Sequence, residues 1–256
     1  MPLPTASLTT GDDVQAQPDS VGERGRPAPR TIVGESWDVG HECGTSSVET
    51  GQEPVRGYVA LTFDDGPTPE TLPSLLDALV TAGARATFFN RGDAAEAHPD
   101  LVRAQRDAGM WIGSHTMTHP HLRETGEREA FEEMNRAQQA LQRITGEWPP
   151  LFRPPFGETD ERVGVLAARL GVLEVLWTVD SRDWAGATED EIVAAARTLR
   201  PGGIFLMHDW ARASVDALPR IIGELRERGL HPGRIGASPC PVPFGDTPFH
   251  ATAVAP

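Results

Sequence analysis

The chain has 256 residues, of which 39% are apolar, and its formal net charge is −14 because 37 acidic residues outnumber 23 basic residues, all of them arginine. An excess of negative charge argues against nucleic acid or an anionic membrane surface as a partner, and it favours a neutral substrate over an anionic polymer. No apolar run reaches the ~18 residues that a membrane span needs, and two cysteines without CxxC spacing exclude a structural zinc site and a disulfide-rich scaffold.

Residues 1–54 are rich in glycine, proline and polar residues and show no sustained periodicity, so we expect a flexible or extended N-terminal segment. The first seven residues have neither a basic nor an apolar stretch, and no secretory signal is expected in the sequence as written. The expected location is therefore cytoplasmic, or secreted if the natural start lies upstream. Cys43 and Cys240 would pair in an oxidising compartment and otherwise remain free thiols. No oligomeric state is predicted.

From Tyr58 onward, strand-like and helix-like segments alternate about six times with short connections. The expected strands are residues 58–63, 86–89, 110–113, 151–153, 175–179 and 203–207. The expected helices are residues 69–82, 99–108, 127–144, 161–170, 188–199 and 214–228. Thr188 and Glu191 have the spacing of a capping box. The alternation predicts a mainly parallel sheet covered by helices, in an open or a barrel form. The Pro- and Gly-rich segment after Leu230 is expected to wrap the surface.

Polar residues stand where strand after strand ends. They are Asp64 and Asp65, His115 and His119, Arg153, Asp180 and Asp183, and His208. In a β/α barrel the carboxyl ends of the strands share one face, which is where such folds carry their active sites. No glycine-rich nucleotide loop follows the first strand, so the sequence does not support a dinucleotide or nucleoside triphosphate site. For the Asp64–Asp65 pair alone, an ordinary turn is the competing explanation.

His115 and His119 are four residues apart, which places them on one face in either a helix or a strand. Alone, such a pair is more often an ordinary surface pair than a ligand pair. Two histidines with a carboxylate from another strand end would leave a coordination position open, as in a catalytic metal site. Imidazole and carboxylate suit Zn²⁺ best, with Co²⁺, Ni²⁺ or Fe²⁺ as alternatives. On the ligands alone, a non-haem iron enzyme also remains open.

Five motifs in order give the chain its resemblance to the polysaccharide deacetylases of carbohydrate esterase family 4, which carry the NodB homology domain. The motifs are residues 62–67 (TFDDGP), 114–120 (SHTMTHP), 153–157 (RPPFG), 180–184 (DSRDW) and 206–208 (LMH). The match covers roughly residues 57–230. It implies a distorted β/α barrel of about seven parallel strands, with a deacetylase domain at residues 55–235 and a C-terminal tail at residues 236–256. It also implies hydrolysis of acetyl groups on sugars of chitin oligomers, peptidoglycan or a related glycan.

The resemblance also implies roles for the matching residues. Asp65, His115 and His119 would hold a divalent metal. Asp64 would be the general base, paired with Arg153. These roles fit the chemistry, because a metal makes water a better nucleophile at neutral pH and a base must accept its proton.

His208 would be the general acid that protonates the leaving nitrogen. Asp183 would fix its tautomer and raise its pKa, with Asp180 as a second candidate for that support. An acid is needed because an amide nitrogen leaves poorly unless it is protonated.

Four residues are expected to contact the substrate. The backbone N–H of Phe156 would hold the oxyanion together with the metal, and Trp184 and Leu206 would wall the pocket for the acetyl methyl. Phe156 stands where the family often has tyrosine, and Trp210 stands where a small residue is common. Trp210 would be a sugar platform or would narrow the cleft, and for both tryptophans the alternative is ordinary packing.

Three other functions remain open from the sequence. The same site would cleave O-acetyl groups as an acetyl-xylan esterase. The lack of a recognisable secretory signal favours a small-molecule amidase or deacetylase of a biosynthetic pathway. A carbohydrate-binding pseudoenzyme is the alternative outside the hydrolases, but the motifs supply base, acid and ligands alike.

Overall fold

The computed structural model describes residues 57–244 and 247–254, and for most of the last two strands it describes the backbone alone. The central strands are β1 (Gly57–Asp64), β2 (Thr87–Asn90), β3 (Trp111–Ser114), β4 (Leu151–Phe152), β5 (Leu173–Glu174), β6 (Val179–Asp180) and β7 (Ile204–His208). They are hydrogen-bonded in the order β5-β4-β3-β2-β1-β7-β6, and every pairing is parallel. The predicted distorted barrel of about seven parallel strands is thus confirmed.

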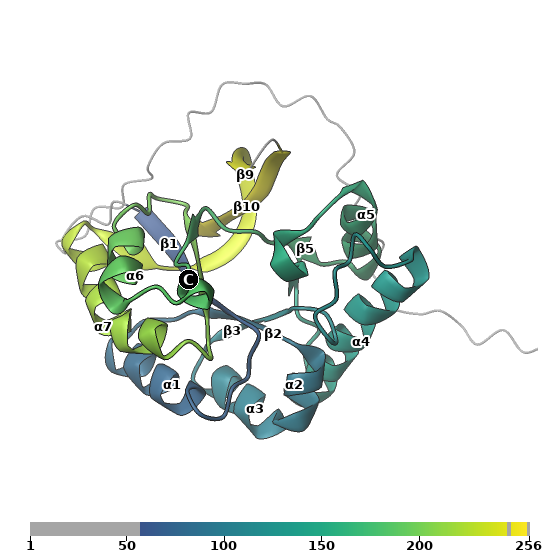
Figure 1. Cartoon of the computed structure of the whole chain (residues 1–256), viewed down its shortest axis with the longest axis horizontal. Helices are drawn as coiled ribbons and strands as arrows, with labels where there is room; N and C mark the ends of the chain where they lie inside the picture. The colour runs from purple at the N-terminus through teal and green to yellow at the C-terminus, as the bar shows by residue number, and fades with distance from the viewer. Residues whose placement is uncertain (1–56, 245–246, 255–256) are drawn as a thin grey trace, which may run out of the picture.

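Among the described residues, seven α-helices follow or connect these strands, and Figure 1 shows them around the outside of the curved sheet. They are α1 (Leu72–Thr81), α2 (Gly92–Ala97), α3 (Pro99–Asp107), α4 (Glu127–Thr145), α5 (Glu161–Leu170), α6 (Glu189–Ala196) and α7 (Arg212–Glu227). All six expected helices are present. The short α2 was not predicted, because its six residues carry too little apolar periodicity to stand out. The capping box of Thr188 and Glu191 is confirmed at the start of α6.

The side chains of β1 alternate between the two faces of the sheet, as the geometry of a strand requires. Val59, Leu61 and Phe63 are buried in the apolar cluster under the helices. Ala60 belongs instead to a second apolar cluster inside the curve of the sheet. By the same alternation Asp64 points to the inside of the barrel, so the strand itself aims this carboxylate at the interior rather than at the helices.

The strand expected at residues 175–179 is mostly wrong, because only Val179 and Asp180 form β6. The carbonyl oxygens of Val175 and Leu176 accept from the Arg153 guanidinium, at 3.2 and 3.1 Å, and therefore have no strand partner. The N–H of Val175, the residue after β5, donates to the carbonyl oxygen of Phe152 in β4. The N–H of Thr178 donates instead to the carbonyl oxygen of Ile204 in β7. Residues 175–178 therefore cross from one edge of the open sheet to the other, where no strand pairing joins β5 to β6 within the described part of the chain.

The segment after Leu230 differs from the expected surface tail. Strand β8 (Leu230–Pro232) pairs in parallel with the start of β1, and β9 (Arg234–Phe244) and β10 (Thr247–Val254) form an antiparallel hairpin. Ile235 and Ala251 of the hairpin are buried in the cluster inside the barrel. The expected domain boundary at residue 235 thus falls inside β9. Many prolines concealed this strand, although proline is tolerated on edge strands such as these.

Several expectations fall on other parts of the chain. Residues 1–54 lie outside the described residues, as do Cys43 and the side chain of Cys240, so the flexible segment and the disulfide stay predictions. Within the described residues, no helix is both long and apolar enough to cross a membrane.

Candidate active site

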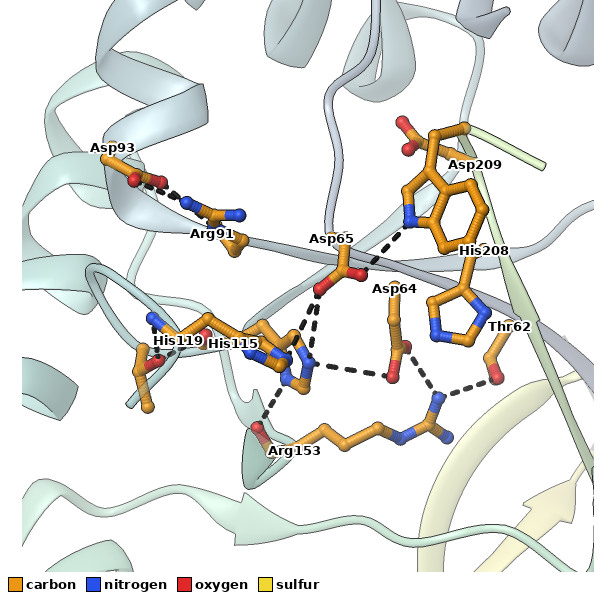
Figure 2. A network of polar contacts seen from close by, with 12 residues as sticks. Thr62, Asp64, Asp65, Arg91, Asp93, His115, His119, Arg153, His208 and Asp209 are labelled. Atoms are coloured by element: carbon orange, nitrogen blue, oxygen red, sulfur yellow. Dashed lines mark hydrogen bonds and ion pairs between the residues drawn. The ribbon is translucent and has the colours of Figure 1, made fainter. Parts of the chain in front are cut away.

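A buried ion pair lies at the end of β1. Nη1 of Arg153 donates to Asp64 Oδ1 at 2.7 Å and to Thr62 Oγ1 at 2.8 Å, and the arginine is 0% exposed. The guanidinium also lies over the ring of Phe89, with 4.2 Å from Cζ to the ring centre. Figure 2 shows Arg153 reaching Asp64 from below the loop that carries Asp65. One oxygen of Asp64 is therefore held by an arginine, while Oδ2 is free to face the histidines.

Asp65, the next residue, takes a different direction because its backbone leaves the strand. Its φ is +71°, the left-handed region, where β1 turns into the loop to α1. Its Oδ1 lies 3.4 Å from His119 Nε2 and 3.7 Å from His115 Nε2. The two adjacent aspartates thus differ in their surroundings: Arg153 holds Asp64, whereas Asp65 faces both histidines, and His115 Nε2 lies close to both carboxylates.

The two histidines present their Nε2 atoms to Asp65. Nδ1 of His115 lies 2.7 Å from the carbonyl oxygen of Arg153, which can only accept, so Nδ1 carries the proton. In the neutral ring Nε2 is then an unprotonated donor atom of the kind that binds metals. Burial, with the neighbouring His115 as the second cause, lowers the pKa of His119 to about 4, and that ring is neutral at pH 7.

A divalent metal fits these three residues. One potential ligand atom from each of Asp65, His115 and His119 lies within 4.8 Å of the others. Asp65 Oδ1 is buried and has no hydrogen-bond partner, which is costly for a carboxylate oxygen unless a ligand satisfies it. Burial alone would raise the pKa of Asp65, but His115, the Trp210 hydrogen bond and His119 outweigh it and lower that pKa. The carboxylate is therefore ionised and available.

His208 ends β7 beside these aspartates and is held by Asp183. Its Nδ1 lies 2.7 Å from Asp183 Oδ1, while Asp183 Oδ2 accepts from the His208 N–H and from Ser214 Oγ. Burial alone would lower the pKa of His208, but the hydrogen bond and charge of Asp183 raise it. The ring is fixed with Nε2 free, which is the arrangement of a histidine that can hold or deliver a proton.

Asp180 does not share this support of His208. Its carboxylate accepts from the Arg182 N–H at 2.7 Å and from Trp184 Nε1 at 3.3 Å. The structure thus brings Asp183, and not Asp180, to the histidine, and it gives Asp180 a place in the turn that carries Trp184.

The residues expected to contact the substrate differ in exposure. Phe156, Trp184 and Trp210 are large exposed side chains, whereas Leu206 is buried. The ring of Phe156 lies edge-on to His119 at 4.5 Å, and its φ of +61° is unusual for a residue with a side chain. Trp210 lies 5.2 Å from the ring of His208. Phe156 therefore lies beside the histidine pair and Trp210 beside Asp65 and His208, whereas the printed contacts of Trp184 are with Asp180 and Asp183.

Two residues near the site were not singled out by the sequence. Asp209 is buried, and its carboxylate accepts from the N–H and the hydroxyl of Thr68 at 2.8 and 2.7 Å. Burial raises the pKa of Asp209 to about 6. His121 stacks on Phe156 at 4.0 Å, and its Nδ1 is 3.2 Å from a Glu158 carboxylate oxygen. Asp209 adjoins a motif residue, but its partner is 141 positions away and no local pattern points to it.

Comparison with known proteins places these features in a family. The sequence profile of the polysaccharide deacetylase family matches residues 51–175. The chain is similar to a peptidoglycan-N-acetylglucosamine deacetylase of Bacillus cereus, with 38% identity over 179 residues, and to a bifunctional xylanase/xylan deacetylase of Cellvibrio japonicus, with 38% identity over 181 residues. The two matches cover 68% and 70% of this chain, but 65% and 27% of those proteins' own lengths.

Among solved structures, the chain is similar to a family 4 carbohydrate esterase from Streptomyces lividans in complex with acetate. The identity is 46%, the TM-score is 0.71, and the match covers 79% of this chain and 99% of that one. The likeness therefore extends over most of this chain and nearly all of that one.

Proposed function

The chain belongs to the polysaccharide deacetylase family, the family 4 carbohydrate esterases, and from that premise we propose that it is a metal-dependent hydrolase that removes acetyl groups from N-acetylated sugars. The observation that carries this proposal is the joint placement of three groups. Asp65 with the histidine pair, Asp64 with Arg153, and His208 with Asp183 meet at one end of the sheet. Figure 2 shows the two aspartates between the histidine pair and His208.

In this proposal Asp65, His115 and His119 hold the metal, most suitably Zn²⁺, with Co²⁺ or Ni²⁺ as alternatives. When bound, such an ion polarises a carbonyl and makes water a better nucleophile at neutral pH. Asp64 takes the proton of the attacking water on Oδ2, because Oδ1 is held by Arg153. The catalytic unit would begin at residue 55 and extend beyond the expected boundary at residue 235, because that residue lies within β9, and residues 1–54 would be outside it.

His208 and Asp183 form the part of the site that acts on the leaving group. His208 delivers a proton from Nε2 to the departing nitrogen, while Asp183 holds its Nδ1. The N–H of Phe156 would support the oxyanion, and Trp184 with Leu206 would enclose the acetyl methyl. Asp180 would act only through the Trp184 indole.

The substrate class in this proposal is a neutral glycan with N-acetylglucosamine units, from chitin oligomers, peptidoglycan or a related polymer. The net charge of −14 disfavours strongly anionic polymers. Acetylated xylan is the second candidate, because one of the relatives is a bifunctional xylanase/xylan deacetylase. The complete set of base, acid and metal ligands favours an enzyme over a carbohydrate-binding pseudoenzyme, and a small-molecule deacetylase would use the same groups.

The test is acetate release from acetylated glucosamine oligomers and from acetylated xylan, each with and without a chelator. We expect release from the glucosamine oligomers to stop with chelator and to return when Zn²⁺ or Co²⁺ is added. Release from xylan alone would favour the esterase. Full activity in a metal-free preparation would contradict the mechanism.

The contact between Asp183 and His208 predicts how the pH dependence of kcat changes when Asp183 is replaced. Because Asp183 raises the pKa of His208, the protonated acid persists to higher pH, and activity is lost as the pH rises through that pKa. Asp183→Asn removes the charge, so the alkaline limb of kcat should move down by about 1–3 pH units. Asp180→Asn is the matched control and should leave that limb in place. Equal shifts in both variants would refute the assignment of Asp183.

A further inference from the structure

The two oxygens of the Asp65 carboxylate have different surroundings. Oδ1 is buried, faces the histidine pair and has no hydrogen-bond partner. Oδ2 accepts a hydrogen bond from the indole Nε1 of Trp210 at 3.1 Å, across 145 positions of sequence. Trp210 thus already holds one oxygen of the Asp65 carboxylate, while the other oxygen has no hydrogen-bond partner.

Trp210 stands on a turn that is fastened to the Asp65 loop at a second point. Its neighbour Asp209 accepts from both the N–H and the hydroxyl of Thr68. A Cβ at Gly66 would lie only 2.1 Å from Asp209 Oδ2, so the glycine lets the two segments come this close. The turn after β7 therefore holds the loop after β1 on both sides of Gly66, at Asp65 and at Thr68.

We propose that Trp210 is a positioning residue for the metal: its indole N–H holds Asp65 Oδ2 and leaves Oδ1 as the single ligand atom of that carboxylate. This inference rests on the proposed function, because it takes Asp65 to be a metal ligand. An indole N–H only donates, so it can orient a carboxylate but cannot itself compete for a cation. A carboxylate bound through one oxygen also leaves more of the coordination sphere to the substrate.

Trp210 is 41% exposed, and the same ring packs near His208, so a substrate platform would be the ordinary explanation of its position. The two roles make different demands on the side chain. A platform needs the face of the ring, whereas the positioning role needs the N–H. Phenylalanine keeps a ring and lacks the N–H, and this difference separates them.

The experiment measures the zinc affinity of the metal-stripped protein by competition with a chromophoric chelator. Trp210→Phe should bind Zn²⁺ about 10–100-fold more weakly than the parent, which is the usual effect of removing a hydrogen-bond partner of a metal ligand. Trp210→Ala should lose a similar factor, since both variants lack the same N–H. Excess Zn²⁺ should restore kcat in Trp210→Phe, as a deficit of bound metal requires.

Trp184→Phe is the matched control, because this indole is also exposed and also donates to a carboxylate, that of Asp180 at 3.3 Å. Asp180 is not a proposed ligand, so the zinc affinity of Trp184→Phe should equal that of the parent. Melting temperatures in chelator should be alike for parent and Trp210→Phe, whereas the rise on adding zinc should be smaller for Trp210→Phe.

Unchanged zinc affinity in Trp210→Phe, with a raised KM, would overturn the inference and leave Trp210 as a platform. The proposed function would then stand, because the parent still binds zinc. A parent that binds no divalent metal would overturn both. Equal losses of affinity in Trp210→Phe and Trp184→Phe would also reject a specific role for the Asp65 contact.

Discussion

Asp64→Asn is expected to keep its metal and to lower kcat by about 10²–10⁴, the usual range for the loss of a general base. The structure gives the physical reason, because Asp64 Oδ1 is bound to Arg153 and only Oδ2 faces the histidines. Asparagine preserves the shape of the side chain and can still accept from Arg153. It cannot take a proton from water, so the chemistry should fail while binding persists.

Asp65→Asn is the matched variant at the next position. Here we expect weaker metal binding, with part of the activity restored by excess metal, because the neutral amide is a poorer ligand than the ionised carboxylate. Metal content and rate are measured together on both purified variants. If Asp64→Asn were purified without metal while Asp65→Asn were metal-loaded and inactive, the two roles would be reversed.

The second large effect is expected on stability. Arg153→Met should lower the free energy of unfolding by about 3–5 kcal/mol, because it leaves the buried Asp64 carboxylate without its positive partner. It also removes the donors to the carbonyls of Val175 and Leu176, which connect the two edges of the open sheet. For a domain of this size the melting temperature should fall by roughly 6–20 °C.

Arg143→Met is the control for this prediction, since Arg143 pairs with Glu96 on the surface and such pairs contribute little. Its melting temperature should stay near that of the parent. The double variant Arg153→Met with Asp64→Asn should recover part of the lost stability, because no unpaired charge then remains buried. A Tm for Arg153→Met equal to that of Arg143→Met would contradict the account.

The hydrophobic pattern of the sequence predicted a parallel sheet covered by helices because that pattern is local, and the resemblance of the motifs added the barrel form. The apolar run at residues 58–63 and the helical spacing in the segments that follow are readable from neighbours in the chain, and they place Asp64 at a strand end. The polar residues at successive strand ends follow from the same reading, since parallel strands share one carboxyl face. The pattern wrongly predicted a strand at residues 175–178, because the carbonyl oxygens of Val175 and Leu176 accept from the Arg153 side chain, and no periodicity reveals such a contact.

The sequence by itself therefore determined the fold class and the residue types available for catalysis. The tertiary structure decided between the candidates that remained, because Asp183 rather than Asp180 reaches His208, and it alone showed that Trp210 reaches Asp65. It also decided that the Pro-rich segment after Leu230 forms strands that put Ile235 and Ala251 inside the barrel. The physical reason is the separation in sequence of the residues involved. A strand or helix depends on residues a few positions apart, whereas each of these contacts joins segments that meet only when the whole sheet has formed.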